Sequence, residues 1–388
     1  MSQSRRQFAL AGLSIALALL ALFTPLRAEA AETAVTIGVT LSATGPGASL
    51  GIPERQTIGM LPATLGGRPV RYVVLDDGSD PTAAAKNARR LATEDKVDAI
   101  IGSSTTPACL AVAAVAADTA TPQLALCPFV PRAEQLRYVF SLPQSVAVMS
   151  DALFDDMKTH QIRTLGFIGF ADSYGEAWLK DVQTRAEARG IRLVDVERYA
   201  RTDSSVTAQT LKLLSVNADA VLIAASGTPG VLPMSTLRER GYKGRIYQTH
   251  GIANNDFLRV AGKSAEGVIV PVGGILVAEQ LPASDRSKSV AQAFAKRYEA
   301  RFGAGSRNLF AGYAFDAYLL LDKAVAVAAR SATPGTQAFR DALVAAIGSV
   351  TDLPATHGVI NISTKDHSAY GAAGRVLVVV RGGQWVLN

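Results

Sequence analysis

The sequence predicts an α/β protein with two lobes, each built on a mainly parallel sheet that is covered by helices. Three observations favour this class. Short apolar runs rich in β-branched residues alternate with helical patterns along the chain. The runs are apolar on both faces, which is typical of parallel strands buried between two helix layers. The chain has 388 residues, which is too many for one ordinary core and fits two.

The N-terminus predicts export. Arg5-Arg6 precedes an apolar run at 8–23, and Ala28-Glu29-Ala30 offers a cleavage site of the small-x-small kind. The run is short for a membrane span, which needs roughly 20 residues, and an uncleaved anchor is the alternative. The paired arginines also resemble a twin-arginine signal. We expect residues 1–30 to be a signal peptide and the mature protein to lie in the periplasm, with the twin-arginine route as one way there.

The alternation of strands and helices runs through most of the chain. Strands are expected at 35–41, 70–75, 99–101, 123–126, 165–170, 191–196, 220–224, 246–248 and 268–272. Helices are expected at 84–91, 110–117, 178–188 and 232–240. Gly190 and Gly241 follow two of these helices and fit helix C-caps. Ser173-Tyr174-Gly175-Glu176 has the spacing of a capping box before another.

Two extended segments, 138–143 and 267–274, interrupt this rhythm and are candidate crossovers between lobes. Residues 307–329 and 336–346 are helical again. Gly382-Gly383 lies between two apolar runs and predicts a β-hairpin at the end of the chain. The lobes are expected to comprise 31–140 with 275–350, and 141–274 with 351–388.

A run of hydroxyl residues after the strand at 99–101 predicts an anion site. Asp80 and Pro81 fit the N-cap and first residue of one helix, and Thr106 with Pro107 repeats the device at the next. The free N–H groups and the dipole at a helix start favour an anion. A small carboxylate is the expected guest, and ordinary helix capping is the alternative. The hydroxyl segment consists of Ser103, Ser104, Thr105 and Thr106.

Composition and charge exclude several classes of function. The formal charge of +6 falls to +4 without the signal peptide, and the Lys and Arg residues are scattered. Nucleic-acid binding is therefore not indicated. Cys109 and Cys127 are too few for a metal cluster. They could form a disulfide in an exported protein, or they are two small buried core residues.

No established enzyme motif is complete, so we expect no catalytic residue, no metal and no cofactor. The segment 45–51 has three glycines after a strand, as a dinucleotide-binding loop does. Its third glycine comes one residue late, and the gap of roughly 30 residues to Asp76 exceeds the usual ~20. A tight loop bordering a cleft is the expected reading, and an exported nucleotide-dependent oxidoreductase is the alternative.

Five motifs, in this order and spacing, carry a resemblance to a known family. They are 37–46 (IGVTLSATGP), 76–81 (DDGSDP), 101–108 (IGSSTTPA), 173–176 (SYGE) and 261–267 (AGKSAEG). The chain resembles the periplasmic solute-binding proteins of the leucine/isoleucine/valine-binding type, which serve ABC transporters. The resemblance implies a type I periplasmic-binding-protein fold, with two Rossmann-like lobes joined by three crossover segments. It also implies a ligand enclosed between the lobes.

The resemblance assigns site residues unevenly. The hydroxyl segment matches the part of the family that binds the ligand carboxylate, and Tyr174 matches an aromatic residue of the cleft. Phe129 stands where the family usually offers small and hydroxyl residues, and Thr228 lies in a segment that replaces a tyrosine-bearing loop. His250 stands at the position of the glutamate that balances the ligand ammonium, which an imidazole cannot replace.

Three carboxylates near the expected cleft are candidates to replace that glutamate: Asp172, Glu176 and Asp256. If none of them points inward, the ligand should lack an ammonium group, because an unpaired buried charge costs several kcal/mol. An aromatic acid that stacks on Phe129 and Tyr174 would then replace the amino acid that the family usually binds. Both ligand classes stay open at this point.

The expected function is binding of a small carboxylate by hinge closure, followed by delivery to the permease and ATPase subunits of an ABC importer. We expect a monomer. The alternative from another class is a sensing module that reports the ligand to a receptor.

Overall fold

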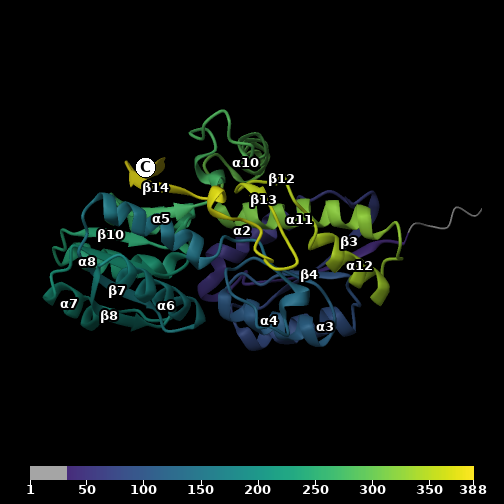
Figure 1. The fold of residues 1–388 in the computed structure, drawn as a ribbon, viewed down its shortest axis with the longest axis horizontal. Helices are drawn as coiled ribbons and strands as arrows, with labels where there is room; N and C mark the ends of the chain where they lie inside the picture. The colour runs from purple at the N-terminus through teal and green to yellow at the C-terminus, as the bar shows by residue number, and fades with distance from the viewer. Residues whose placement is uncertain (1–32) are drawn as a thin grey trace, which may run out of the picture. The chain divides into compact units, whose positions relative to one another are not determined.

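The computed structural model describes residues 33–388, so the expected signal peptide lies outside the described residues. Two sheets organise this part of the chain (Figure 1). The first has six strands in the order β2-β3-β1-β4-β5-β6, and the second has seven in the order β15-β14-β11-β10-β9-β7-β8. We call their surroundings the N-terminal lobe and the C-terminal lobe. The predicted α/β class with parallel sheets in two lobes is confirmed.

The N-terminal lobe is parallel except at one edge, where β2 runs antiparallel to β3. Its strands are β1 (Val35–Leu41), β2 (Thr64–Leu65), β3 (Arg68–Asp76), β4 (Ala99–Gly102), β5 (Gln123–Ala125) and β6 (Val139–Ser141). Its helices include α2 (Ala48–Ile58), α3 (Pro81–Thr93) and α4 (Thr106–Asp118). Farther along the chain lie α10 (Lys288–Phe302), α11 (Leu309–Ala328) and α12 (Gln337–Ile347).

The C-terminal lobe is completed by the end of the chain. Its strands are β7 (Thr164–Phe170), β8 (Arg192–Tyr199), β9 (Ala220–Ala224), β10 (Arg245–Gln248), β11 (Ile269–Val272), β14 (Val376–Arg381) and β15 (Gln384–Leu387). Its helices are α5 (Val146–Thr159), α6 (Ser173–Ala188), α7 (Thr207–Ser215), α8 (Val231–Glu239) and α9 (Asn255–Ala261). The hairpin β14–β15 is confirmed, and it pairs antiparallel with β11. A separate pair is formed by β12 (Leu353–Pro354) and β13 (Val359–Ile360).

The helix ends test the sequence predictions individually. Asp80 caps α3 by accepting a hydrogen bond of 2.7 Å from the backbone N–H of Ala83, as predicted. Gly190 and Gly241 follow α6 and α8 with φ of +67° and +87°, the left-handed conformation that favours glycine after a helix. Both glycine predictions are confirmed.

Two cap predictions are wrong. The N-cap of α4 is Thr105, whose side chain makes no capping hydrogen bond, and Thr106 is already helical. The N-cap of α6 is Asp172, whose carboxylate accepts hydrogen bonds from the N–H groups of Tyr174 and Gly175. The capping box assigned to Ser173 and Glu176 therefore does not form, because the preceding aspartate is the better acceptor.

Two segments differ from the predicted elements. Residues 139–141 of the expected crossover form β6, which pairs with β5 at the edge of the first sheet. The segment 45–51, expected as a loop, is a short 3-10 helix at Gly45–Gly47 followed by the first turn of α2. The crossing itself begins after β6.

The chain passes between the lobes three times, after β6, after β11 and after α12. Buried polar groups meet where these passages converge. Asp316 of α11 accepts hydrogen bonds from the Thr356 backbone, the His357 ring (2.7 Å) and the Tyr370 hydroxyl. The Tyr313 hydroxyl donates to Gln144 at 2.6 Å. This network fixes the first and the last passage to one helix.

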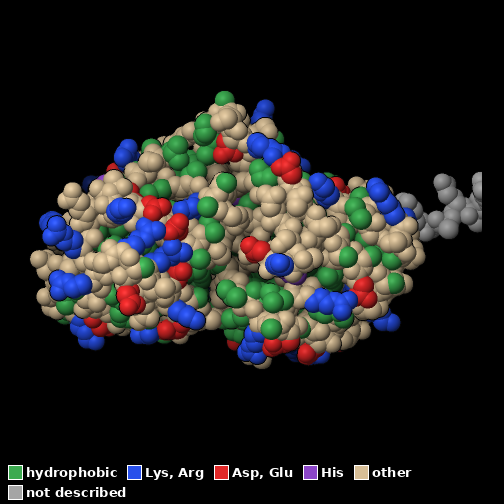
Figure 2. All heavy atoms as spheres, viewed as in Figure 1, with side chains coloured by type: hydrophobic (Ala, Val, Ile, Leu, Met, Phe, Trp, Pro, Cys, Tyr) green, Lys and Arg blue, Asp and Glu red, His purple; other side chains and the backbone are tan. Residues whose placement is uncertain are grey.

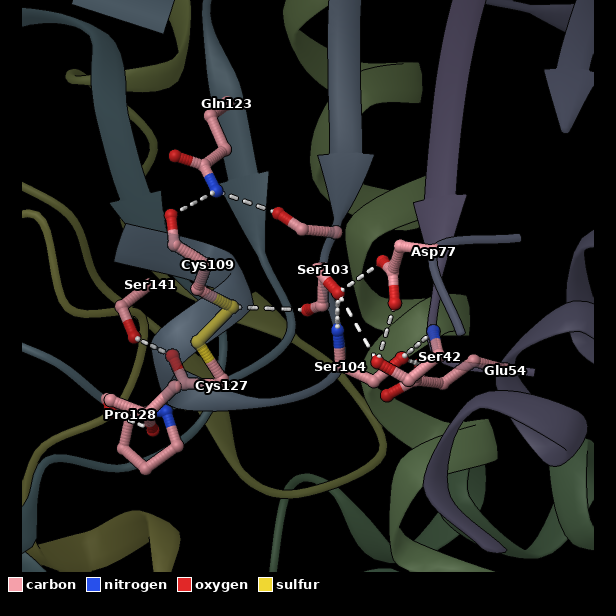
Figure 3. The surroundings of a disulfide bond; sticks show 12 residues. Ser42, Glu54, Asp77, Ser103, Ser104, Cys109, Gln123, Cys127, Pro128 and Ser141 are labelled. Carbon is pink, nitrogen blue, oxygen red and sulfur yellow. Dashed lines mark hydrogen bonds between the residues drawn. A yellow bond between two sulfur atoms is a disulfide. The ribbon is translucent and has the colours of Figure 1, made fainter. Parts of the chain in front are cut away.

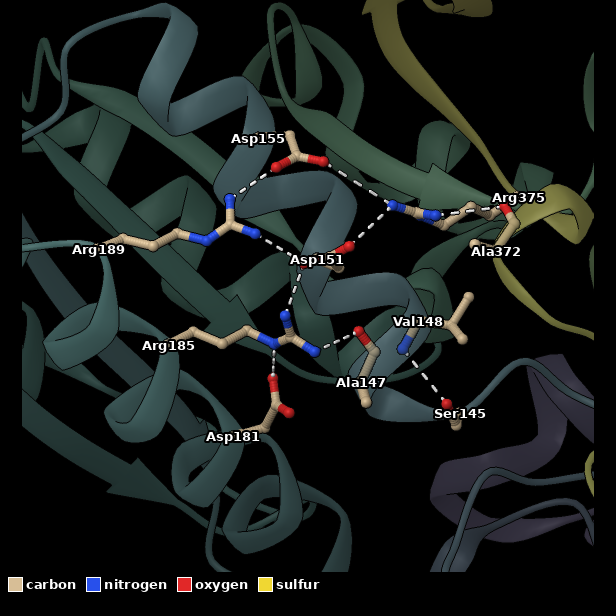
Figure 4. A network of polar contacts seen from close by, with 10 residues as sticks. All are labelled: Ser145, Ala147, Val148, Asp151, Asp155, Asp181, Arg185, Arg189, Ala372 and Arg375. Atoms are coloured by element: carbon tan, nitrogen blue, oxygen red, sulfur yellow. Dashed lines mark hydrogen bonds and ion pairs between the residues drawn. The ribbon is translucent and has the colours of Figure 1, made fainter. Parts of the chain in front are cut away.

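An ionic network ties the last passage to the C-terminal lobe (Figure 4). Asp151 of α5 accepts from Arg185 and Arg189 of α6, both at 2.7 Å. Arg375, just before β14, contacts the other oxygen of Asp151 at 3.4 Å. The contacts join two helices and the final crossover.

Candidate functional site

The carboxyl ends of strands from both sheets border one cavity. In open α/β sheets, ligands bind in the crevice outside these strand ends. The N-terminal lobe and its connections contribute Leu50, Ser104, Thr105, Thr106, Leu126, Cys127, Pro128, Pro143, Phe310 and Tyr313. The C-terminal lobe contributes Tyr174, Arg201, Ser226, His250 and Gly251. The cavity measures about 20 Å³, which is room for about one water molecule.

The hydroxyl segment follows β4 directly, but most of its hydroxyl groups are used inside the protein (Figure 3). Ser103 does not line the cavity and donates to Asp77 at 2.7 Å. The Ser104 hydroxyl donates to Glu54 and accepts from the backbone N–H of Ser42. Thr106 donates to the carbonyl of Pro128. Within residues 33–388, Thr105 is the member of this segment whose side-chain hydroxyl makes no hydrogen bond to the protein.

A disulfide fixes the wall beside this segment. Cys109 in the first turns of α4 is bonded to Cys127, which follows β5 and lines the cavity. Both side chains are buried. The disulfide alternative from the sequence is therefore confirmed, and the bridge holds the start of α4 against the loop after β5 (Figure 3).

His250 is the most isolated polar side chain of the site. It follows β10, is 2% exposed, and neither ring nitrogen has a hydrogen-bond partner in the described structure. Burial, together with a smaller effect of the nearby His357, lowers the pKa of His250 to about 3. The imidazole is therefore neutral at ordinary pH, and it offers one donor and one acceptor.

Aromatic rings surround His250. The rings of Tyr174 and Trp178, both on α6, have centroids 6.5 and 6.0 Å from that of His250. The Tyr174 hydroxyl donates to Thr249 at 2.8 Å, and burial raises the pKa of Tyr174 to about 12. Tyr174 is therefore a neutral wall of the cavity and not a proton donor or acceptor that titrates near neutral pH.

Arg201 lines the cavity and was missed in the sequence analysis. It lies two residues after the end of β8, at the carboxyl end of a parallel strand. That position is a signal that could have identified it, because binding residues gather at such strand ends. No motif marked it, since it lies in a short turn between β8 and α7.

Two predicted residues lie outside the lining. Phe129 packs beside the disulfide and borders a separate groove between α4, α5 and α6, which shares Thr106 with the cavity. Thr228 begins a short 3-10 helix and does not line the cavity. Phe310 and Tyr313 of α11 supply the aromatic surface that the sequence analysis assigned to Phe129.

None of the three candidate carboxylates lines the cavity. Asp172 caps α6 and pairs with Arg201 at 2.6 Å. Glu176 pairs with Arg198 at the surface, and Asp256 pairs with Arg259. Each is already committed to a cationic partner, so none is free to balance a ligand ammonium.

Two further features were sought in the described residues: a group of metal ligands and a helix that could span a membrane. Among residues 33–388, no group of three or more His, Cys, Asp or Glu side chains could hold a metal ion. Over the same range, no helix is long and apolar enough to cross a membrane. Figure 2 shows Lys and Arg side chains spread among Asp and Glu side chains on the face in view.

Comparison with known proteins gives a consistent family. A family profile described as "Periplasmic binding protein" matches residues 34–384. The structure of an extracellular ligand-binding receptor from Rhodopseudomonas palustris HaA2 is 43% identical, with a TM-score of 0.90, covering 92% of this chain and 99% of that one. No curated protein sequence matches the chain.

Two more distant structures share the fold. A leucine-binding protein from Thermotoga maritima is 22% identical, with a TM-score of 0.78, covering 91% of this chain and 97% of that one. An ABC-transporter solute-binding protein from R. palustris, in complex with benzoate, is 21% identical, with a TM-score of 0.78, covering 91% of this chain and 95% of that one. At these identities the likeness concerns the fold alone.

Proposed function

The chain belongs to the periplasmic binding protein family, and from this premise we propose that it binds a small carboxylate that lacks an ammonium group. The ligand occupies the cavity between the lobes and is delivered to the permease and ATPase subunits of an ABC importer. The family and its solved relatives are ligand-binding proteins, so the chain is not an enzyme. The nucleotide-dependent oxidoreductase, kept as an alternative in the sequence analysis, is therefore wrong.

One observation carries the proposed ligand class: among residues 33–388, no carboxylate lines the cavity. An amino acid brings an ammonium group, and burying that group without a negative partner costs several kcal/mol. A ligand that carries a carboxylate and no ammonium group suits the start of α4, because the N–H groups and the helix dipole there favour an anion. The lining therefore supports an acid over an amino acid.

The remaining lining supports a ring on that acid. Tyr174, Phe310 and Tyr313 present aromatic side chains to the cavity, and aromatic pairs prefer centroid spacings of about 4.5–7 Å. The uncommitted nitrogens of His250 can bond a ring hydroxyl. The benzoate complex of the R. palustris transporter protein is consistent with an aromatic acid in this fold. We therefore propose a hydroxybenzoate-like acid.

Calorimetric titration of the ligand-stripped protein tests this function. We expect 4-hydroxybenzoate to bind more tightly than leucine. A thermal shift should accompany binding, since a ligand at ~100 times its dissociation constant stabilises the folded form by about 2.7 kcal/mol. Micromolar leucine binding with no response to aromatic acids would show that the ligand class is misassigned.

A sensing role would use the same cavity and the same ligand. The structure of the R. palustris HaA2 relative carries the description "receptor". Genes for a permease and an ATPase beside this one would favour transport, and a neighbouring signalling receptor would favour sensing.

A further inference from the structure

Arg201 has one nitrogen with no acceptor in the described structure. Its Nε donates to Asp172 at 2.6 Å, and its Nη1 donates to Ser226 at 2.7 Å. Its Nη2 is buried and has no partner. Because Arg201 lines the cavity, this nitrogen is the part of the guanidinium that the protein leaves unsatisfied at the site.

The guanidinium is held in a fixed plane. Its central carbon lies 4.1 Å from the centroid of the Phe170 ring, and its side chain is only 13% exposed. With two of its nitrogens bonded and its face against a ring, the group cannot turn Nη2 to water without breaking those contacts. An unsatisfied buried donor of a charged group costs more than a neutral one, which points to an anionic acceptor from outside the chain.

The N-terminal lobe presents its own anion site to the same space. Thr105 and Thr106 at the start of α4 line the cavity together with Arg201. The helix start and the guanidinium therefore border the same cavity of about 20 Å³. His250, 2% exposed and without partners, borders the same space and is neutral.

We propose that Arg201 is the anchor of the C-terminal lobe for the ligand carboxylate, and that one carboxylate bridges Arg201 and the start of α4. This inference rests on the proposed function and names a specificity-determining residue within it. A carboxylate that contacts both lobes stabilises the closed arrangement directly. Arg201 favours acids over amides and disfavours ligands with a cationic group near the carboxylate.

Asp172 holds the Arg201 guanidinium in place. It accepts from Arg201 through Oδ2 and caps α6 through Oδ1. Replacing Asp172 with asparagine keeps an oxygen for the cap, because asparagine is about as good an N-cap as aspartate. The amide nitrogen then replaces Oδ2 and faces the Nε–H of Arg201, so two donors meet and the guanidinium loses a contact that holds its plane. The asparagine variant should therefore bind the acid less tightly.

The test compares 4-hydroxybenzoate with its neutral analogue 4-hydroxybenzamide by calorimetry on the full mature protein. Arg201→Met should weaken binding of the acid at least tenfold and that of the amide much less, and Arg201→Lys should fall between wild type and Arg201→Met. Asp172→Asn should weaken acid binding about threefold or more. Arg198→Met is the matched control, and it should leave binding unchanged. Arg198 lies near the end of β8, the strand that Arg201 follows, and it pairs with Glu176 outside the cavity lining.

The outcomes separate the two proposals. If the wild-type protein binds no acid probe, the proposed function fails and the role of Arg201 fails with it. If the wild type binds the acid and a folded Arg201→Met variant binds it equally well, only the role of Arg201 is overturned. If Arg201→Met does not fold, Asp172→Asn decides: unchanged or tighter acid binding overturns the inference.

Discussion

Glu54 is a buried carboxyl group directly behind the ligand site. It is fully buried, accepts a hydrogen bond from Ser104, and has a second oxygen without a partner in the described structure. Burial raises the pKa of Glu54 well above its usual value, and the nearby Asp77 raises it further. The carboxyl is therefore easier to ionise in the unfolded chain than in the folded protein.

The sign of this shift predicts how Glu54→Gln acts. A group whose pKa is raised by folding contributes stability below its unfolded pKa, and that contribution is lost as pH rises toward the folded pKa. The variant cannot ionise, so it should gain stability over wild type as pH rises above about 4.5. Thermal unfolding at pH 4 and pH 8 checks this.

The control for Glu54→Gln is Glu176→Gln, where Arg198 lowers the pKa of the surface carboxyl. Stability from Glu176 is present above its unfolded pKa and is lost as pH falls. This variant should therefore be less stable than wild type at pH 8 and approach it at low pH. The same pH trend in both variants would contradict the raised pKa of Glu54.

His250 predicts a selective change in ligand preference. His250→Leu should weaken 4-hydroxybenzoate about tenfold, since a lost neutral hydrogen bond costs roughly 0.5–1.5 kcal/mol, and should leave benzoate almost unchanged. With a pKa of about 3, His250 should add no pH dependence to binding between pH 5.5 and 8. Calorimetry of both acids over that range is the measurement, and equal losses for the two acids would refute a bond to the ring hydroxyl.

At the residue scale, the sequence indicated positions near the cavity where a strand end is followed by a recognisable helix start. Residues 104–106 and His250 line the cavity, and their part in ligand binding stays a prediction. Phe129 lies outside this lining and packs beside the disulfide, a tertiary contact that the local pattern does not carry. Arg201 was missed because its proposed role depends on which of its nitrogens has no hydrogen-bond partner, and only the tertiary structure shows that.

The disulfide links covalently two elements beside the cavity, the start of α4 and the loop after β5. It closes a sequence separation of 18 residues, and a loop of this size stabilises the fold by about 3 kcal/mol in the chain-entropy description. The double variant Cys109→Ala, Cys127→Ala should lose about that much stability in urea unfolding. It should also bind the acid less tightly, because the start of α4 is less fixed.

Reducing agent supplies the control for the double variant. A reductant should lower the stability of wild type under conditions that open the bridge and leave the double variant unchanged. Equal stability of oxidised wild type and double variant would mean that the bridge adds nothing to the fold.

At the scale of elements, apolar runs predicted the long parallel strands well. β1 and β9 are observed at the predicted residues, because strands buried on both faces leave a continuous apolar signal. β6 was taken for part of a crossover because its three residues are too few to show a period. The first turn of α2 was expected to be part of a loop, because the segment 45–51 contains three glycines, which normally weaken a helix.

For the whole molecule, the small cavity predicts that the lobes move. About 20 Å³ is far below the ~300 Å³ or more of usual ligand pockets, so an aromatic acid cannot enter while the lobes keep this arrangement. Ligand should bias an equilibrium between open and closed states. Small-angle scattering should give a smaller radius of gyration with 4-hydroxybenzoate than without it. Identical profiles for verified empty and saturated samples would refute ligand-driven closure.

Each lobe is assembled from segments far apart in the sequence, which bears on how the protein is made. In the N-terminal lobe, the Thr57 hydroxyl of α2 donates a hydrogen bond to the carbonyl of Ala311 in α11. In the C-terminal lobe, one edge of β11 pairs with β14, which comes more than 100 residues later in the chain. Neither lobe can complete its core when its own early strands leave the ribosome, since the missing pieces come from beyond residue 309 and residue 376. Each lobe therefore reaches its complete native core only after most of the chain has been synthesised.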